Sequence, residues 1–124
     1  MEVLENLKYT QNHEWVLIKD NIVTVGITDF AQTELGDIVY VDVDTMGISL
    51  NIDDVFGSVE AVKTVSDLFM PVKGEIIEIN PLLENNPELV NVSPYKDGWI
   101  VKVRVEQSND KLLTAQEYKN HIGI

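Results

Sequence analysis

The stretch Gly57-Ser58-Val59-Glu60-Ala61-Val62-Lys63-Thr64-Val65-Ser66-Asp67-Leu68-Phe69-Met70-Pro71 places one lysine between two runs of strand-forming residues. These runs extend from Val55 to Val62 and from Val65 to Met70. Both have the residue types of half-buried strands, and they are too close in sequence to be anything but neighbours. We therefore predict a hairpin over about residues 55–70, with Val62-Lys63-Thr64 at its tip and the lysine side chain in solvent.

A second hairpin is predicted upstream. Asp20-Asn21 has the chemistry of a two-residue hairpin turn. The strands on either side of it are expected over Trp15 to Lys19 and Ile22 to Ile27. Leu7 to Thr10 is a short opening strand in this interpretation, and Gln11 to Glu14 is a polar loop.

The other strands are predicted from residue type and alternation. Every second residue from Trp99 to Val105 is apolar, with charged residues between them from Lys102 onward, so this apolar set is expected to face the core. Further strands are expected at two places, and two polar connections separate the elements. The strands are Ile38 to Val43 and Glu75 to Ile79, and the connections are Asp44 to Asp54, with a brief extended piece, and Asn80 to Pro94, with a helical turn near Leu82-Leu83.

Two helices are predicted from their capping residues. Thr28 or Asp29 can cap a short helix from Phe30 to Leu35, with Gln32 completing a capping box and Gly36 as a left-handed terminator. A second capping box, Thr114 with Glu117, predicts a C-terminal helix over about residues 114–122.

The pattern of many short strands and little helix predicts a mainly β protein, a flattened antiparallel β-sandwich or barrel. A length of 124 residues suits one domain with a modest core, so we expect residues 1–124 to form a single unit.

The composition narrows the functional classes. The chain has 21 acidic and 9 basic side chains and a net charge of −12, which disfavours nucleic acid and membrane surfaces as partners and favours basic protein surfaces. It contains no cysteine, so any redox chemistry has to come from an attached group. The N-terminus lacks the pattern of a signal or transit peptide. We expect a monomeric cytoplasmic protein, or a mitochondrial matrix protein only if a transit peptide is missing from this chain.

The lysine stretch resembles the attachment hairpin of lipoyl carrier domains, and Gly-Ser-Val-Glu-Ala-Val-Lys is similar to the H proteins of the glycine cleavage system in particular. Other segments resemble H-protein motifs in the same order along the chain. They are Leu7-Lys8-Tyr9, His13-Glu14-Trp15-Val16, Gly26-Ile27-Thr28, Leu35-Gly36-Asp37, Val90-Asn91, Ser93-Pro94-Tyr95, Asp97-Gly98-Trp99 and Leu113-Thr114-Ala115 with Tyr118.

This resemblance implies a non-catalytic carrier with a lipoyl fold, which bears lipoate on Lys63 and moves an aminomethyl group and reducing equivalents between enzymes. The implied partners each supply one reaction. They are a pyridoxal-phosphate glycine decarboxylase, an aminomethyltransferase that uses tetrahydrofolate, a dihydrolipoyl dehydrogenase with FAD and NAD, and a lipoate ligase or lipoyl/octanoyl transferase.

The resemblance also implies roles for single residues. Glu14 is the leading partner of the cationic amine that the arm carries, and Asp67 is the second candidate. The rest of the implied cleft is Asn12, Ile27 and Leu35, and the residues implied in recognition by the lipoylating enzyme are Gly57, Glu60 and Gly74.

Other interpretations stay open. An exposed lysine is most often a solvated charge, and Glu14 on composition alone is a solvated loop carboxylate. No nucleophile-base pair, phosphate loop or metal-ligand cluster supports an enzyme. An interaction domain with an unmodified Lys63 is possible, as is a lipoyl donor in lipoate relay to other lipoyl-dependent complexes.

Overall fold

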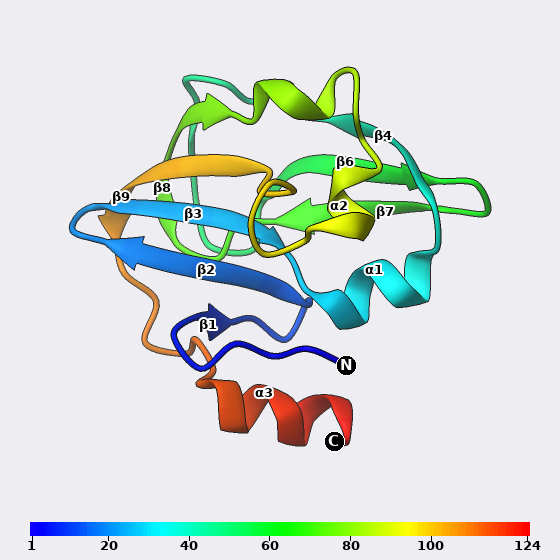
Figure 1. Ribbon diagram of the computed structural model, residues 1–124. Helices are drawn as coiled ribbons and strands as arrows, with labels where there is room; N and C mark the ends of the chain where they lie inside the picture. The colour runs from blue at the N-terminus through cyan, green and yellow to red at the C-terminus, as the bar shows by residue number, and fades with distance from the viewer.

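The computed structural model describes residues 1–124 and contains two antiparallel sheets with short helices at their margins (Figure 1). The larger sheet has the order β1-β2-β3-β9-β8-β5, from Lys8–Tyr9, Glu14–Lys19, Ile22–Ile27, Val101–Gln107, Lys73–Ile79 and Ser49–Leu50. The smaller sheet has the order β4-β6-β7, from Ile38–Asp42, Val55–Ala61 and Val65–Phe69. The helices are α1 (Asp29–Leu35), the 3-10 turn η1 (Pro81–Leu83), α2 (Leu89–Val92) and α3 (Ala115–Ile122). The predicted mainly β sandwich is confirmed.

Both predicted hairpins are present. β2 and β3 pair in register from Lys19 opposite Ile22, with Asp20 at the turn in a left-handed backbone conformation (φ 57°). β6 and β7 pair with residues 62–64 at the tip, and Figure 1 shows this hairpin pointing away from the rest of the molecule. One boundary matters for the site: β2 begins at Glu14, which was predicted to lie in a loop.

The core lies between the two sheets and is built by alternation along their strands. Val23 and Val25 of β3 and Val101 and Val103 of β9 point into one apolar cluster with almost no exposed surface. The predicted alternation fails at its first member. Ile100 is fully buried in this core, whereas Trp99 packs against a second cluster beneath α3, because the strand pairing starts only at Val101.

Helix capping follows the predictions in part. Thr114 and Glu117 form the complete capping box of α3, and Gly123 ends this helix in the left-handed region. The cap of α1 is Thr28, whose hydroxyl accepts from the Ala31 N–H. The Asp29–Gln32 contact is a side-chain bond and no capping box. Gly36 has a positive φ of 82°, but its ψ of −158° is extended, so it is no left-handed helix terminator.

The segment between β8 and β9 contains the predicted turn η1 and also α2, which was not predicted. α2 lies against α1, and Asn91 joins the two regions. Its amide donates to the Gly36 carbonyl (2.8 Å) and to the Gln32 side chain (3.0 Å), while its oxygen accepts from the Ile38 N–H (2.9 Å). One polar side chain thus fixes the path from α1 into β4. None of the helices is long and apolar enough to cross a membrane.

Candidate functional site

The lysine hairpin has a fixed backbone and a free side chain. The Ala61 N–H donates to the Thr64 carbonyl across the tip (2.8 Å), and the Val62 N–H donates to the Asp37 carbonyl (3.2 Å). Lys63 itself is exposed, and it takes part in none of the three ion pairs. The hairpin therefore presents the Lys63 amine to solvent, while the Asp37 carbonyl, in the loop after α1, holds the backbone at Val62.

A hollow of about 350 Å³ lies beside Lys63. Its walls are residues 33–37, which are the last residues of α1 and the two that follow, together with Val62 and Lys63. Leu35, predicted as part of an apolar wall for the arm, lines this hollow. Since Asn91 holds the Gly36 carbonyl, the position of this wall depends on α2, which no simple sequence pattern indicated.

Gly57 and Gly74, predicted as recognition residues, both lie where strands approach closely. A Cβ on Gly57 would come within 2.4 Å of the Asp42 carbonyl, and one on Gly74 within 2.3 Å of the Arg104 carbonyl. Their presence thus has a packing reason. Glu60, the third member, is exposed on β6, opposite Tyr40 on one side and Val65 on the other. Recognition by a lipoylating enzyme stays a prediction for all three.

Glu14 is the most deeply buried carboxylate, with 2% of its surface exposed. The Thr10 hydroxyl donates to Oε1 (2.6 Å) and the Phe69 N–H donates to Oε2 (3.2 Å). Burial raises the pKa of Glu14 to about 7 from its ordinary 4.5, against the two hydrogen bonds, and the nearby charge of Asp53 adds to the increase. At neutral pH this carboxyl group is therefore poised between its protonated and ionised forms.

The strand β7 connects Lys63 to Glu14. It is the outer strand of the smaller sheet, so one of its edges has no strand partner. Lys63 precedes this strand, and Phe69 at its other end donates to Glu14. Asp67 lies between them, exposed on β7. From Val65 to Phe69 the strand spans roughly 13 Å.

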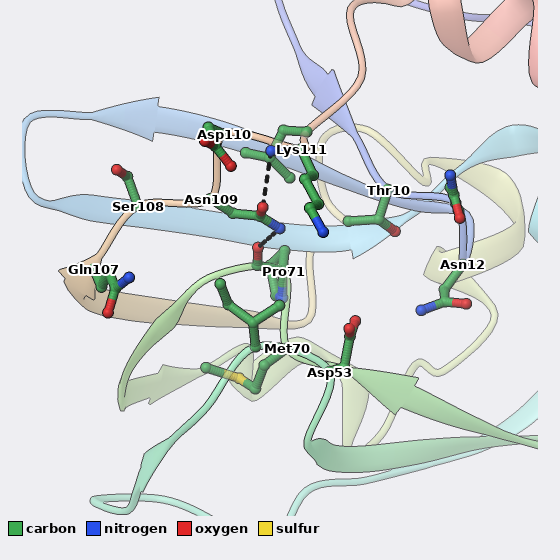
Figure 2. Close-up of a pocket in the computed structure, with 13 residues that line it drawn as sticks. Thr10, Asn12, Asp53, Met70, Pro71, Gln107, Ser108, Asn109, Asp110 and Lys111 are labelled. Carbon is green, nitrogen blue, oxygen red and sulfur yellow. Dashed lines mark hydrogen bonds between the residues drawn. The ribbon is translucent and has the colours of Figure 1, made fainter.

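Figure 2 shows a second hollow, of about 480 Å³. It lies near Glu14, because Thr10 in its wall donates to that carboxyl group. Asn12, a predicted cleft residue, lines it together with Thr10, whose hydroxyl binds Glu14. Asp53 lines it as well, a residue that sequence reasoning did not single out. The predicted residues are thus divided: Leu35 and Lys63 share one hollow, Asn12 lines the other, and Ile27 is buried in the main core and lines neither.

His13, just before Glu14, belongs to an aromatic cluster under α3. Its Nδ1 lies 2.9 Å from the Tyr118 hydroxyl, which is also 2.7 Å from the Thr28 Oγ1. Its ring packs at 4.8 Å from Phe30 and 5.5 Å from His121, centroid to centroid. Burial lowers the pKa of His13, and the nearby His121 lowers it further. Neither histidine needs a metal or a catalytic role to account for its position.

A lysine at the tip of a hairpin in a flattened antiparallel sandwich defines a carrier protein of the lipoyl-domain type. The family described as glycine cleavage H-protein matches residues 7–123. The chain belongs to this family, and its role is that of a lipoyl carrier in glycine cleavage.

Individual relatives agree with the family match. The chain is 51% identical over 121 residues to a glycine cleavage system H protein from Bacteroides fragilis and 50% identical to one from Bacteroides thetaiotaomicron, with 96% of each chain covered in both cases. It is also similar to the crystal structure of a glycine cleavage system H protein from Mycobacterium marinum. That comparison has a TM-score of 0.92 and 36% identity, and covers 98% of this chain and 100% of the other.

Proposed function

We propose that lipoate is attached to Lys63 by an amide bond and that residues 1–124 act as one non-catalytic carrier domain. The observation that carries this proposal is the tip of the lysine hairpin, where the amine is free in solvent while Val62 and Ala61 are held by backbone hydrogen bonds. A rigid base under a flexible arm raises the effective concentration of the arm's end at a docked partner.

The residues around Lys63 suit a long neutral side chain. An acylated lysine has no charge, so the attached arm can lie against Leu35 in the neighbouring hollow or along the free edge of β7. Bound lipoate supplies a strained cyclic disulfide that accepts electrons and an aminomethyl cargo. A lysine extended by an eight-carbon acyl chain reaches roughly 15 Å, comparable to the length of β7.

We further propose that Glu14 stabilises the cationic cargo amine when the arm is folded back. A carboxyl group with a pKa of about 7 is easily ionised by an approaching cation, because opposite charge favours the carboxylate. The Thr10 hydroxyl and the Phe69 N–H already hold both oxygens in place, so the group is oriented before the cargo arrives. Asp67 guides the amine along β7, Asn12 adds a polar contact near Glu14, and Ile27 supports the apolar wall from the core.

The partners in this proposal are the glycine decarboxylase, the aminomethyltransferase, the dihydrolipoyl dehydrogenase and a lipoate-attaching enzyme, met in the cytoplasm. The charge distribution supports basic docking surfaces on them. Residues 20–72, which contain the lysine hairpin, have ten acidic side chains, and Lys63 is their only basic one. Acylation removes that charge, so this part of the surface attracts basic partners more strongly once the arm is attached.

The attachment is tested by incubating wild type, Lys63→Arg and Lys96→Arg with a lipoate ligase, ATP and lipoate, followed by intact-mass measurement and peptide mapping. We expect one lipoyl group on wild type and on Lys96→Arg, the control at another exposed lysine, and none on Lys63→Arg. Modification of Lys63→Arg would overturn the assignment. A wild type that stays unmodified while a known acceptor is fully loaded would support the unmodified interaction domain instead.

A further inference from the structure

The hollow near Glu14 is built by four separate parts of the chain, residues 10–12, 52–53, 70–71 and 107–112 (Figure 2). The last part is pinned across the hollow. The Asn109 side chain donates to the Pro71 carbonyl (2.9 Å), and the Lys111 N–H donates to the Asn109 side-chain oxygen (2.9 Å). The shape of the hollow therefore depends on specific hydrogen bonds.

Two opposite charges face this hollow. Figure 2 shows the Lys111 ammonium pointing into it from one side and the Asp53 carboxylate rising from the other. Neither belongs to an ion pair, since the three ion pairs of the protein are Lys102–Glu78, Arg104–Glu75 and Lys119–Glu5.

The two charges differ in mobility. Asp53 has a short side chain on a left-handed backbone (φ 71°), and its N–H is fixed to the Met70 carbonyl at 2.9 Å. An aspartate in this region carries some backbone strain, which surrounding contacts have to maintain. Lys111 has a long flexible side chain at an exposed position, and only its backbone is anchored. The carboxylate is thus the permanent feature of the hollow, and the ammonium can leave.

The hollow is coupled to Glu14. Thr10 forms part of its wall, and its hydroxyl donates to Glu14 (2.6 Å). The charge of Asp53 helps to raise the pKa of that buried carboxyl group. Met70 and Pro71 follow Phe69, so the hollow begins where the edge of β7 ends.

We propose that this hollow is an ammonium site in which the Asp53 carboxylate binds the cargo amine of the folded arm in competition with the Lys111 ammonium, which faces the same hollow in the unloaded protein without forming an ion pair. This inference rests on the proposed carrier function and adds Asp53 and Lys111 as positioning residues. With the arm extended, Lys111 neutralises the hollow. A loaded arm brings its own cation and displaces Lys111. Once the cargo has been passed on, the end of the arm is uncharged and Lys111 returns, so the loaded arm is retained selectively.

The ammonium site is tested first on the unlipoylated protein with methylammonium chloride as the probe. Amide NMR shifts of Asp53, Met70 and Lys111 report its binding, with sodium chloride at equal ionic strength as the reference. We expect Lys111→Gln to tighten methylammonium binding roughly 2- to 5-fold and Asp53→Asn to weaken it by a similar factor, as for one exposed charge pair. Lys96→Gln and Asp44→Asn, exposed charges outside the hollow, are matched controls with wild-type affinity. An unchanged or weaker affinity in Lys111→Gln, or an unchanged affinity in Asp53→Asn, would overturn the proposal.

A second measurement uses the lipoylated protein loaded by its decarboxylase, with hydrolytic release of ammonia as the readout. Lys111→Gln should lengthen the lifetime of the cargo and Asp53→Asn should shorten it, again severalfold, and equal lifetimes would contradict the competition. Failure of the carrier function itself has a different signature: wild type would accept no lipoate, while the methylammonium titration would still decide whether the ammonium site exists.

Discussion

The two ends of β7 are built in opposite ways. At one end Lys63 has an exposed side chain, and only backbone hydrogen bonds hold its surroundings. At the other end Glu14 is buried, with both carboxyl oxygens bound by Thr10 and by the N–H of Phe69. The first arrangement lets a group attached to Lys63 reach partner enzymes, and the second favours retention of a bound cargo on the protein. A carrier needs both, because its cargo must visit several enzymes and be protected between visits.

The strongest change in stability is expected from the burial of Glu14. Because its pKa is raised to about 7, the folded protein retains the proton over a range in which the unfolded chain has lost it. The stability from this group is complete below pH 4.5 and is lost as the pH rises to about 7. Glu14→Gln keeps the shape and the acceptor for Phe69 but does not titrate.

Urea denaturation at a series of pH values measures this effect. The stability of wild type relative to Glu14→Gln should fall by roughly 3 kcal/mol between pH 4 and pH 8. Every other group titrates in both proteins, so the difference isolates Glu14. A difference that is constant over this range would mean that the carboxyl group is solvated and that the two ends of β7 are alike.

A smaller loss of stability is expected from Gly57→Ala, in the hairpin that carries Lys63. The added Cβ would lie 2.4 Å from the Asp42 carbonyl and 3.0 Å from a Val43 methyl group, so β4 and β6 have to separate. Overpacking of this kind costs about 2 kcal/mol. Ser58→Ala, at the next position, is the control and should be nearly neutral in the same denaturation experiment. Slower lipoylation of Gly57→Ala with unchanged stability would show that Gly57 is recognised and has no packing role.

The sequence predicted the lysine end better than the Glu14 end, for a physical reason. The hairpin around Lys63 is a local feature, since its two strands are adjacent in sequence and pair with each other. The helix α3, which begins with a capping box, and the Asp20-Asn21 turn are local in the same sense. Such features depend on residues a few positions apart, which a single sequence displays directly.

The Glu14 end depends on contacts between distant parts of the chain. Glu14 appeared to lie in a polar loop, and its burial results from the β7 edge 55 residues later. Asp53 and residues 107–112 meet Asn12 only through the fold. Trp99 lies outside the inward-facing set predicted for it, and Ile100 is buried in the core, for the same reason, because the start of pairing between β3 and β9 decides which side chain points inward.

The smallest loss of stability is expected in the aromatic cluster around His13, the residue before Glu14. Tyr118→Phe removes a hydroxyl that lies 2.9 Å from the His13 Nδ1 and 2.7 Å from the Thr28 Oγ1, while its stacking on Tyr9 at 4.6 Å is retained. The variant should lose about 1 kcal/mol of stability, the usual net contribution of a buried hydrogen bond. Tyr40→Phe, which alters an exposed tyrosine of the smaller sheet, is the matched control.

Amide hydrogen exchange shows which part of the molecule is loosened by Tyr118→Phe. The Glu14 N–H donates to the Thr10 hydroxyl (3.1 Å) directly after His13, so its exchange should accelerate when His13 loses Tyr118. The Ala61 N–H, which donates across the lysine tip, should exchange as in wild type, because no contact of Tyr118 reaches the hairpin. Equal acceleration at both amides would show that the two ends of β7 open together, so that holding the cargo and presenting the lysine could not be altered separately.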